Sequence, residues 1–173
     1  MNAREERQKE QIKMEQRMTH FGVGPKIMAP ALAYDIVAGM ATHFWPDVFL
    51  IRSVSGSILA CAGIVLLIFG IPMWAIAVWT IVRAFKRGEL VTSGVYRLVR
   101  HPLYSALIIF ILPGIALLCR SWPMLLASVV AYIIFKLLIK REDRYLEEKF
   151  GKAYLDYRSR VNEIIPIPRF YRR

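Results

Sequence analysis

The sequence predicts an all-α integral membrane protein, a bundle of about four transmembrane helices with a cytoplasmic C-terminal helix. Hydrophobic residues make up 56% of the 173 residues, and the mean hydropathy is +0.39. Soluble globular domains contain only about 45–50% apolar residues. The apolar residues also occur in long blocks, and basic residues flank these blocks. Composition, block length and charge position therefore all favour a membrane protein of one domain.

Four apolar blocks are candidate membrane spans, at about residues 27–44, 57–82, 103–118 and 122–139. A helix needs about 20 apolar residues to cross roughly 30 Å of hydrocarbon. The second block exceeds this length, so we expect it to tilt or to bend at Pro72. The third and fourth blocks are slightly short, and the few residues between them predict a tight helical hairpin.

The basic residues predict which ends of the spans face the cytoplasm. Six Lys or Arg residues precede the first block, five separate the second from the third, and eleven occur from residue 136 onward. The two other connections carry only one each, Arg52 and Arg120. Cytoplasmic loops carry the excess of Lys and Arg. We therefore expect a multi-pass protein with both termini and the connection between the second and third spans in the cytoplasm.

Two further segments complete the predicted organisation. Residues 1–26 form a charged cytoplasmic N-terminal arm, either a solvated helix or disordered, and residues 27–173 form the membrane domain. Within this domain, we expect a cytoplasmic C-terminal helix at about 140–161, with Gly151 as a point where it breaks. Its apolar face recurs at intervals of four, four and three residues. The residues of this face are Leu146, Phe150, Tyr154 and Tyr157.

The same composition argues against several other functions. A net charge of +11 suits nucleic acid or anionic lipid. Because the basic residues flank apolar blocks, we expect membrane lipids as partners and no nucleic acid. Cys61 and Cys119 lie in apolar blocks without a zinc-like cluster, so we expect two buried thiols and no metal site. No cleavable signal peptide is expected, because residues 1–20 lack an apolar core.

A first polar cluster lies in the connection before the third span. Arg97 and Arg100 can bind a carboxylate or a phosphate. His101 precedes Pro102, which is well tolerated in the first turn of a helix, so this cluster marks a helix N-terminus that favours an anion. The alternative is structural: the two arginines fix the topology, and His101 only caps the span.

A second polar cluster lies at the cytoplasmic end of the fourth span. Glu142 and Asp143 are adjacent carboxylates that can accept a substrate ammonium or hold a ribose. The alternative is a solvated helix with internal ion pairs. A third polar residue, Asp35, lies in the first span, where a carboxylate usually faces the bundle or a cavity. It lines an acceptor pocket, pairs with Lys136, or lies at the interface if the span begins deeper.

Together, the two clusters resemble the family of integral membrane methyltransferases that includes isoprenylcysteine carboxyl methyltransferase and the phospholipid methyltransferases. The resemblance covers roughly residues 80–168, whereas the first half matches only in being hydrophobic. The matching residues are Gly94, Val95, Tyr96, Arg97, Arg100, His101, Pro102, Leu103, Tyr104, Glu142, Asp143, Leu146, Phe150, Gly151, Tyr154, Tyr157 and Pro166. The chain departs from the usual family pattern at Val95, where Pro is common, at Ala106, where Gly is common, and at Asp143, where Glu is usual.

The resemblance implies an S-adenosylmethionine-dependent methyltransferase with a cytoplasm-facing cofactor site and a lipophilic acceptor from the bilayer. The implied cofactor-binding residues are Tyr96, Arg97, His101, Pro102, Leu103, Tyr104, Glu142 and Asp143, with Arg100 lining the same pocket. Methyl transfer from a sulfonium requires mainly proximity and alignment. The candidate catalytic residues are Arg100, which would orient an acceptor carboxylate, and Glu142. For an amine or thiol acceptor, Glu142 or His101 would remove the proton.

Other interpretations stay open at this point. Membrane sterol reductases carry a similar Arg-His-Pro motif and bind NADPH, although they have many more spans. A non-catalytic membrane lipid-binding protein would keep the motif as architecture only. Among methyltransferases, the acceptor is a prenylcysteine carboxylate, a phospholipid amine or a small lipophilic thiol. The sequence does not indicate the oligomeric state or the particular membrane.

Overall fold

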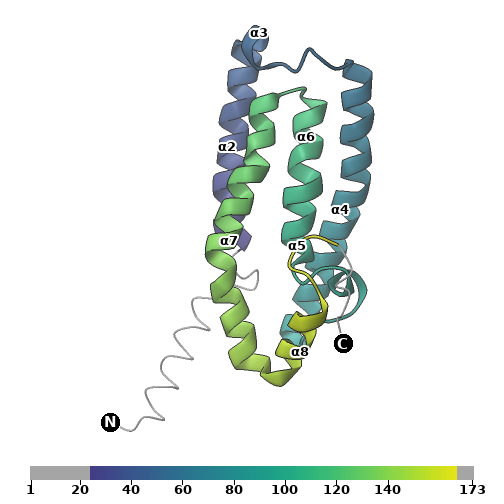
Figure 1. The fold of residues 1–173 in the computed structure, drawn as a ribbon, viewed down its shortest axis with the longest axis vertical. Helices are drawn as coiled ribbons and strands as arrows, with labels where there is room; N and C mark the ends of the chain where they lie inside the picture. The colour runs from purple at the N-terminus through teal and green to yellow at the C-terminus, as the bar shows by residue number, and fades with distance from the viewer. Residues whose placement is uncertain (1–23, 167–173) are drawn as a thin grey trace, which may run out of the picture.

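The computed structural model describes residues 24–166, apart from the side chain of residue 85. Most of the predicted N-terminal arm therefore lies outside the described residues. Within 24–166 the chain is helical and contains no β-strand, only one isolated bridge between Leu50 and Ser121. Figure 1 shows long helices standing side by side, with short helices at both ends. The predicted all-α class is confirmed for this part of the chain.

Among residues 24–166, three helices are long and apolar enough to cross a membrane. They are α2 (Gly24–Phe44), α4 (Gly56–Arg87) and α7 (Trp122–Phe150). The first two agree closely with the predicted blocks, and α4 continues through Pro72. Helix α7 is longer than predicted, and its 29 residues give about 43 Å. Since this exceeds the roughly 30 Å hydrocarbon layer, one end of α7 extends beyond the apolar region.

The predicted third span is a shorter apolar helix, residues 102–118. It consists of α5 (Pro102–Ser105), the π-helical segment η2 (Ala106–Ile111) and α6 (Leu112–Leu118). Pro113 has no amide hydrogen, and its ring would clash with the carbonyl four residues earlier in a regular α-helix. The wider π turn just before it relieves this clash, and such turns are frequent at functional sites.

The helices pack in the order α2, α7, α6, α4, with α6 and η2 against α4 and with α2 against α7. The largest buried cluster joins α2, α5, η2, α6 and α7 around Tyr104 and Phe135. Helices α4 and α6 approach closely at Gly63, where an added Cβ would lie 2.7 Å from the carbonyl oxygen of Gly114. Small residues permit this kind of close helix packing in membranes.

The outer faces of the long helices carry exposed apolar side chains, as expected of a surface in contact with lipid. Examples are Ile36, Met40, Ile58, Phe69, Trp79, Ile133 and Leu137. Cys61 and Cys119 are exposed on this surface as well. The prediction of two buried thiols is therefore wrong. An apolar block shows only that a residue avoids water, and in a membrane bundle that residue can face either the core or the lipid.

The predicted tight hairpin between the third and fourth spans is present at the upper end in Figure 1. Arg120 adopts a φ of 54°, and the Ser121 side chain accepts a hydrogen bond from the Met124 amide at the start of α7. The Ser121 hydroxyl also lies 2.7 Å from the hydroxyl of Thr42 on α2. The short helix α3 (Pro46–Phe49) lies beside this turn, and the Trp122 indole donates a hydrogen bond to the carbonyl of Val48 within it.

Asp35 lies inside the bundle, where it is only 6% exposed and its Oδ1 has no hydrogen-bond partner within the described residues. The pairing with Lys136 that we considered from the sequence is not present. The Lys136 ammonium instead lies 2.5 Å from the Glu163 carboxylate. The reason is that Lys136 directly follows the buried Phe135 on α7, so the Lys136 side chain points out of the core.

The connection before α5 and the end of α7, which carry the two polar clusters of the sequence, lie at the lower end in Figure 1. Helix α7 continues past residue 139 without a break and ends at Gly151, whose positive φ of 53° favours glycine. Helix α8 (Lys152–Arg160) then folds back toward the bundle, so the segment predicted at 140–161 is the end of α7 followed by α8. The short 3₁₀ helix η1 (Gly94–Arg97) joins α4 to α5 at this end.

Candidate active site

The two polar clusters of the sequence meet at the lower end of the bundle. Arg100 and His101, which are each 5% exposed, lie just before α5, and Asp143, 6% exposed, lies on the extension of α7. Burial of polar and charged side chains is costly unless they are hydrogen-bonded or paired, so these residues need partners close by. We call this group the polar cluster, and its members are Arg100, His101, Tyr104, Glu142, Asp143 and Tyr154.

Local sequence explains how each element delivers its side chains. Pro102 starts α5 at the first helical position, and His101 immediately precedes it with a non-helical backbone, so both side chains stay at the start of the helix. The buried face of α7 repeats every four residues and ends in a carboxylate. The residues of this stripe are Ala127, Ala131, Phe135, Ile139 and Asp143.

The imidazole of His101 lies between two carboxylates. Its Nε2 is 3.2 Å from Asp143 Oδ1, and its Nδ1 is 3.6 Å from Glu142 Oε1. The rings of Tyr104 and Phe135 pack beside it, with centroids 6.0 and 5.8 Å away. Burial alone would lower the pKa of His101, but the hydrogen bonds and charges of Asp143 and Glu142 outweigh it and raise the pKa above its usual value of 6.5.

The Arg100 guanidinium is enclosed by acceptors. Nη1 lies 3.4 Å from Asp143 Oδ2 and 3.4 Å from the Tyr154 hydroxyl, and Nη2 lies 3.4 Å from Glu163 Oε1. Its Nε is buried and has no hydrogen-bond partner in the part of the chain that the structure describes. The Tyr154 hydroxyl also donates to Asp143. Burial and the hydrogen bond to Asp143 raise the pKa of Tyr154, so this residue acts as a neutral donor.

Tyr104, within the cluster, and Tyr96, outside it, have different surroundings. Tyr104 donates a hydrogen bond of 3.0 Å to Glu142 Oε2. Tyr96 is buried and donates to the carbonyl of Ala77 on α4 at 3.3 Å, while its own carbonyl accepts a 2.6 Å bond from Tyr157. Burial, with a smaller effect of the Glu142 charge, raises the pKa of Tyr96. Tyr96 therefore fastens η1 to α4 and α8 through its hydroxyl and carbonyl.

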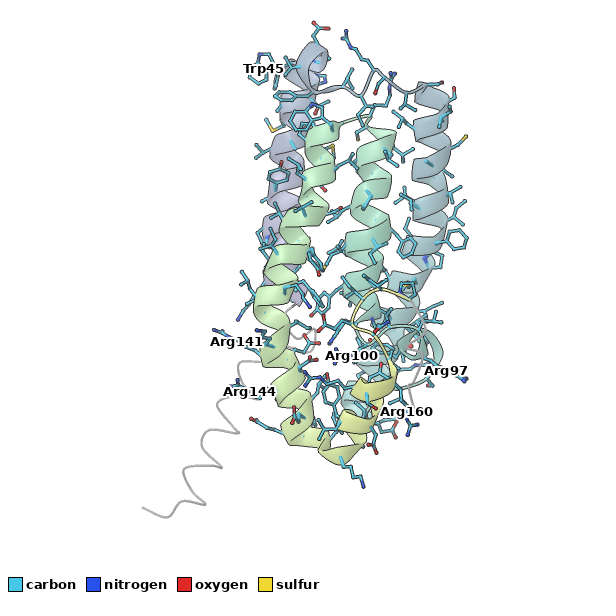
Figure 2. The ribbon with its side chains drawn as sticks, viewed as in Figure 1. Trp45, Arg97, Arg100, Arg141, Arg144 and Arg160 are labelled. Carbon is cyan, nitrogen blue, oxygen red and sulfur yellow. The ribbon has the colours of Figure 1, made fainter. Side chains whose placement is uncertain are left out.

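Most of the residues that the sequence singled out are brought together. Pro102 is buried, and Leu103 packs against the core. Tyr96 is buried as well, and its hydroxyl is hydrogen-bonded to α4. Arg97 is different, because it is exposed and Figure 2 shows it at the edge of the molecule, away from Arg100. The roles of all these residues in cofactor binding and catalysis stay predictions.

Other residues of the site could not be selected from the sequence. Tyr154 belongs to the helical pattern 146–157 and to the residues that carry the family resemblance, but neither assigns it a role in the site. Phe135 lies under the His101 ring but looks like any other apolar residue of a span. Glu163 approaches Arg100 from a non-helical segment near the C-terminus that shows no periodicity. The four-residue spacing that ends in Asp143 is one signal that would have marked this carboxylate as buried.

The chemistry of the cluster suits a small ligand with both charges. A buried guanidinium offers donors, adjacent carboxylates offer acceptors, and aromatic rings of Tyr104 and Phe135 offer apolar faces. Within residues 24–166, no group of His, Cys, Asp and Glu side chains has an arrangement that could hold a metal ion. The cluster lies at the end of the bundle where the apolar part of α7 gives way to charged residues. A site at this position is accessible in principle to water-soluble and to membrane-bound molecules.

The comparison with known families tests the resemblance stated from the sequence. The model of the phospholipid methyltransferase family matches residues 51–153, which include α4, the polar cluster up to Asp143, and α7. The chain belongs to this family. The match begins earlier than the predicted resemblance, so the family likeness includes α4 and the loop before it. With its three long apolar helices, this member of the phospholipid methyltransferase family is a multi-pass membrane protein.

Its curated relatives carry the names of prenylcysteine methyltransferases. Protein-S-isoprenylcysteine O-methyltransferase B of Arabidopsis thaliana is 28% identical over 137 residues, or 74% of this chain and 63% of that protein. The Rattus norvegicus protein-S-isoprenylcysteine O-methyltransferase is 30% identical over 132 residues, 71% of this chain and 45% of that protein. The Schizosaccharomyces pombe protein of that name is 40% identical over 87 residues, 49% and 37% of the two chains. The chain thus spans less than two thirds of the length of these relatives.

Proposed function

We propose that the protein transfers a methyl group from S-adenosylmethionine to a lipophilic acceptor at the cytoplasmic face of the membrane. The observation that carries this proposal is the meeting of Arg100 and His101 with Glu142 and Asp143 in one buried cluster. Its place at the end of the apolar helices supports the combination of a soluble donor with an acceptor from the bilayer. The family membership supports methyl transfer as the reaction.

The polar cluster fits the chemical groups of S-adenosylmethionine. The donor carries a carboxylate, an ammonium, a ribose diol and an adenine ring. The buried Nε of Arg100 has no hydrogen-bond partner among residues 24–166, so we assign this N–H donor to the carboxylate of the methyl acceptor and not to that of S-adenosylmethionine. The carboxylate of Glu142, held by Tyr104 at 3.0 Å, suits the ammonium or the ribose. The aromatic rings of Tyr104 and Phe135 suit the adenine, and Pro102, Leu103 and Asp143 complete the walls.

The bound donor would supply a methyl group activated by a sulfonium. The protein then needs to hold the donor and the acceptor in line and to exclude water. Arg100 is the candidate to orient an acceptor carboxylate, because a guanidinium pairs with carboxylates. Asp143 contacts both Arg100 and His101 and so fixes their positions. Because its raised pKa keeps more of His101 protonated, less of it is free to accept a proton, and Glu142 is the candidate general base where an acceptor must lose a proton.

A prenylated cysteine carboxylate is the acceptor that the relatives favour. The named relatives are O-methyltransferases of isoprenylcysteine proteins, and a carboxylate acceptor needs no general base at neutral pH. Arg100 matches this acceptor in charge. A phospholipid amine would have no such partner in Arg100, although the description of the family names phospholipids.

We further propose that residues 27–173 form the methyltransferase domain, and that residues 102–118 are a fourth membrane crossing. This helix lies between α4 and α7, and its 17 residues give about 26 Å. The positive-inside rule supports placing the polar cluster and both termini in the cytoplasm. Figure 2 shows Trp45 at one end of the bundle, and Arg97, Arg141, Arg144 and Arg160 at the other.

A methyl-transfer assay tests the proposed reaction. The full chain in lipid vesicles is given S-adenosylmethionine labelled in its methyl group, together with a farnesylated cysteine, phosphatidylethanolamine or a lipophilic thiol. We expect label in the farnesylated cysteine, released by mild base as methanol, since a methyl ester is base-labile. Label in the amine or the thiol would leave methyl transfer intact but overturn the carboxylate acceptor, and no label in any acceptor would contradict the proposed function.

A further inference from the structure

The residues after α8 form a strap across the start of α5, and we call residues 161–166 the C-terminal strap. The amide of Arg100 donates to the carbonyl of Asn162 at 2.7 Å, and the amide of His101 donates to the carbonyl of Glu163 at 2.9 Å. The strap lies outside the part of the chain that the family model matches. It covers the backbone of the two residues that begin the polar cluster.

A third anchor fixes the strap to the bundle. The Ser105 hydroxyl donates to the carbonyl of Ile164 at 2.6 Å, and the Ile164 side chain, 4% exposed, packs in the main hydrophobic cluster. All three polar anchors use carbonyl groups of the strap as acceptors. The side chain of Glu163 is therefore not needed to hold the strap in place.

The Glu163 side chain makes a different set of contacts. Its Oε1 lies 3.4 Å from Nη2 of Arg100, and its Oε2 lies 2.5 Å from the ammonium of Lys136 on α7. The side chain of Arg100 is 3% exposed, that of Glu163 is 30% exposed, and that of Lys136 is 46% exposed. Glu163 thus bridges a buried cation and a cation at the surface.

The two carboxylates near Arg100 approach different nitrogens. Asp143 approaches Nη1 and Glu163 approaches Nη2, both at 3.4 Å. A buried guanidinium without one of its partners turns toward the remaining one, because an unpaired buried charge is costly. Loss of Glu163 would leave the guanidinium to Asp143 and Tyr154, and would turn the unpartnered Nε to another direction.

We propose that Glu163 is a positioning residue, which holds the Arg100 guanidinium in the orientation needed for methyl transfer while Lys136 holds Glu163. This inference rests on the proposed methyltransferase function. It assigns to the C-terminal strap a role in methyl transfer, in addition to covering the backbone of Arg100 and His101. It also predicts that Glu163 acts through its charge and length, since the backbone of the strap is held by other groups.

The test compares Glu163→Gln, which removes the charge but keeps the shape, with Glu163→Asp, which keeps the charge. Both are made in the full chain, and kcat, the KM of a farnesylated cysteine, the Kd of S-adenosylhomocysteine and the melting temperature are measured. We expect Glu163→Gln to lower kcat roughly tenfold to a hundredfold, as for a catalytic group displaced by about 1 Å. The Kd and the melting temperature should change little, and Glu163→Asp should recover part of kcat.

Two further variants sharpen the result. Lys136→Gln removes the outer partner and should lower kcat in the same way but by less. Glu147→Gln removes a carboxylate from a surface ion pair with Arg158, 3.6 Å long, and should leave kcat unchanged. An unchanged kcat in Glu163→Gln would overturn the inference.

A parallel loss of kcat, Kd and melting temperature would also overturn it, because it would show a purely structural role. Absence of any methyl transfer by the wild-type protein has a different meaning. It would overturn the proposed function and the inference with it, whereas an active wild type beside an equally active Glu163→Gln would remove only the inference.

Discussion

The imidazole of His101 lies 3.2 Å from the carboxylate of Asp143, which follows it by 42 residues in the chain. This contact joins the start of α5 to the extension of α7, and the intervening residues form a complete helical hairpin. Arg100, the neighbour of His101, contacts the other oxygen of the same carboxylate. Asp143 is therefore the point at which the two sequence motifs are tied together, and it is more deeply buried than Glu142.

Replacing Asp143 by Asn should damage both stability and ligand binding. The substitution leaves the buried Arg100 without its nearest carboxylate on α7, and loss of one partner of a buried ion pair costs about 3–5 kcal/mol. We expect a clearly lower melting temperature and weaker binding of S-adenosylhomocysteine. Asp156→Asn on α8 is the control, because Asp156 is exposed. A melting temperature equal to that of the control would show that Asp143 does not stabilise the buried charge of Arg100.

The raised pKa of His101 predicts a specific dependence of stability on pH. Because the folded state holds the proton more tightly than the unfolded chain, the stabilising contribution is complete below pH 6.5. It is lost as the pH rises through the higher pKa of the folded protein. Melting temperatures measured from about pH 6 to about pH 9 should fall more steeply in the wild type than in His101→Gln.

The exposed His43 at the opposite end provides the control for this pH experiment. His43→Gln should keep the wild-type slope. A wild-type melting temperature that rises over this pH range relative to His101→Gln would contradict the assignment, because it would mean that folding favours neutral His101.

Tyr104 should contribute to the site through its hydroxyl rather than its ring. Tyr104→Phe keeps the packing against Phe135 and His101 but removes the 3.0 Å hydrogen bond to Glu142. One hydrogen bond contributes about 0.5–1.5 kcal/mol, or roughly twofold to twelvefold in affinity. Calorimetry with S-adenosylhomocysteine should show this loss, whereas Tyr132→Phe, at a side chain 41% exposed, should bind as the wild type does.

The close contact between α4 and α6 should make Gly63 sensitive to substitution. An added Cβ would lie 2.7 Å from the Gly114 carbonyl and 3.0 Å from Leu118, so Gly63→Ala must push the helices apart. Overpacking of this kind costs about 1–3 kcal/mol. Gly39→Ala is the matched substitution, since its Cβ would meet only the Met124 sulfur at 3.8 Å. Equal melting temperatures for the two variants would contradict the packing of α4 on α6.

The sequence predicted the helices well because long apolar blocks leave few alternatives to a membrane helix. It also selected Arg100, His101, Glu142 and Asp143, which the fold brings together. It did not distinguish the two carboxylates, because neighbouring residues on a helix point in different directions and their burial depends on what packs against α7. The exposed thiols and the contact of Glu163 with Arg100 depend on tertiary packing, which has no local signal.

Calorimetric titration of the full chain with S-adenosylhomocysteine tests the central claim most directly, with NADPH as the parallel ligand and Glu142→Gln as the site variant. We expect the wild type to bind S-adenosylhomocysteine and not NADPH. Binding by Glu142→Gln should be at least about tenfold weaker, as for loss of a charged hydrogen-bond partner, while Glu148→Gln, at an exposed carboxylate on the same helix, should keep wild-type affinity. Binding of NADPH alone, binding of neither ligand, or wild-type affinity in Glu142→Gln would contradict a methyl-donor site in the polar cluster.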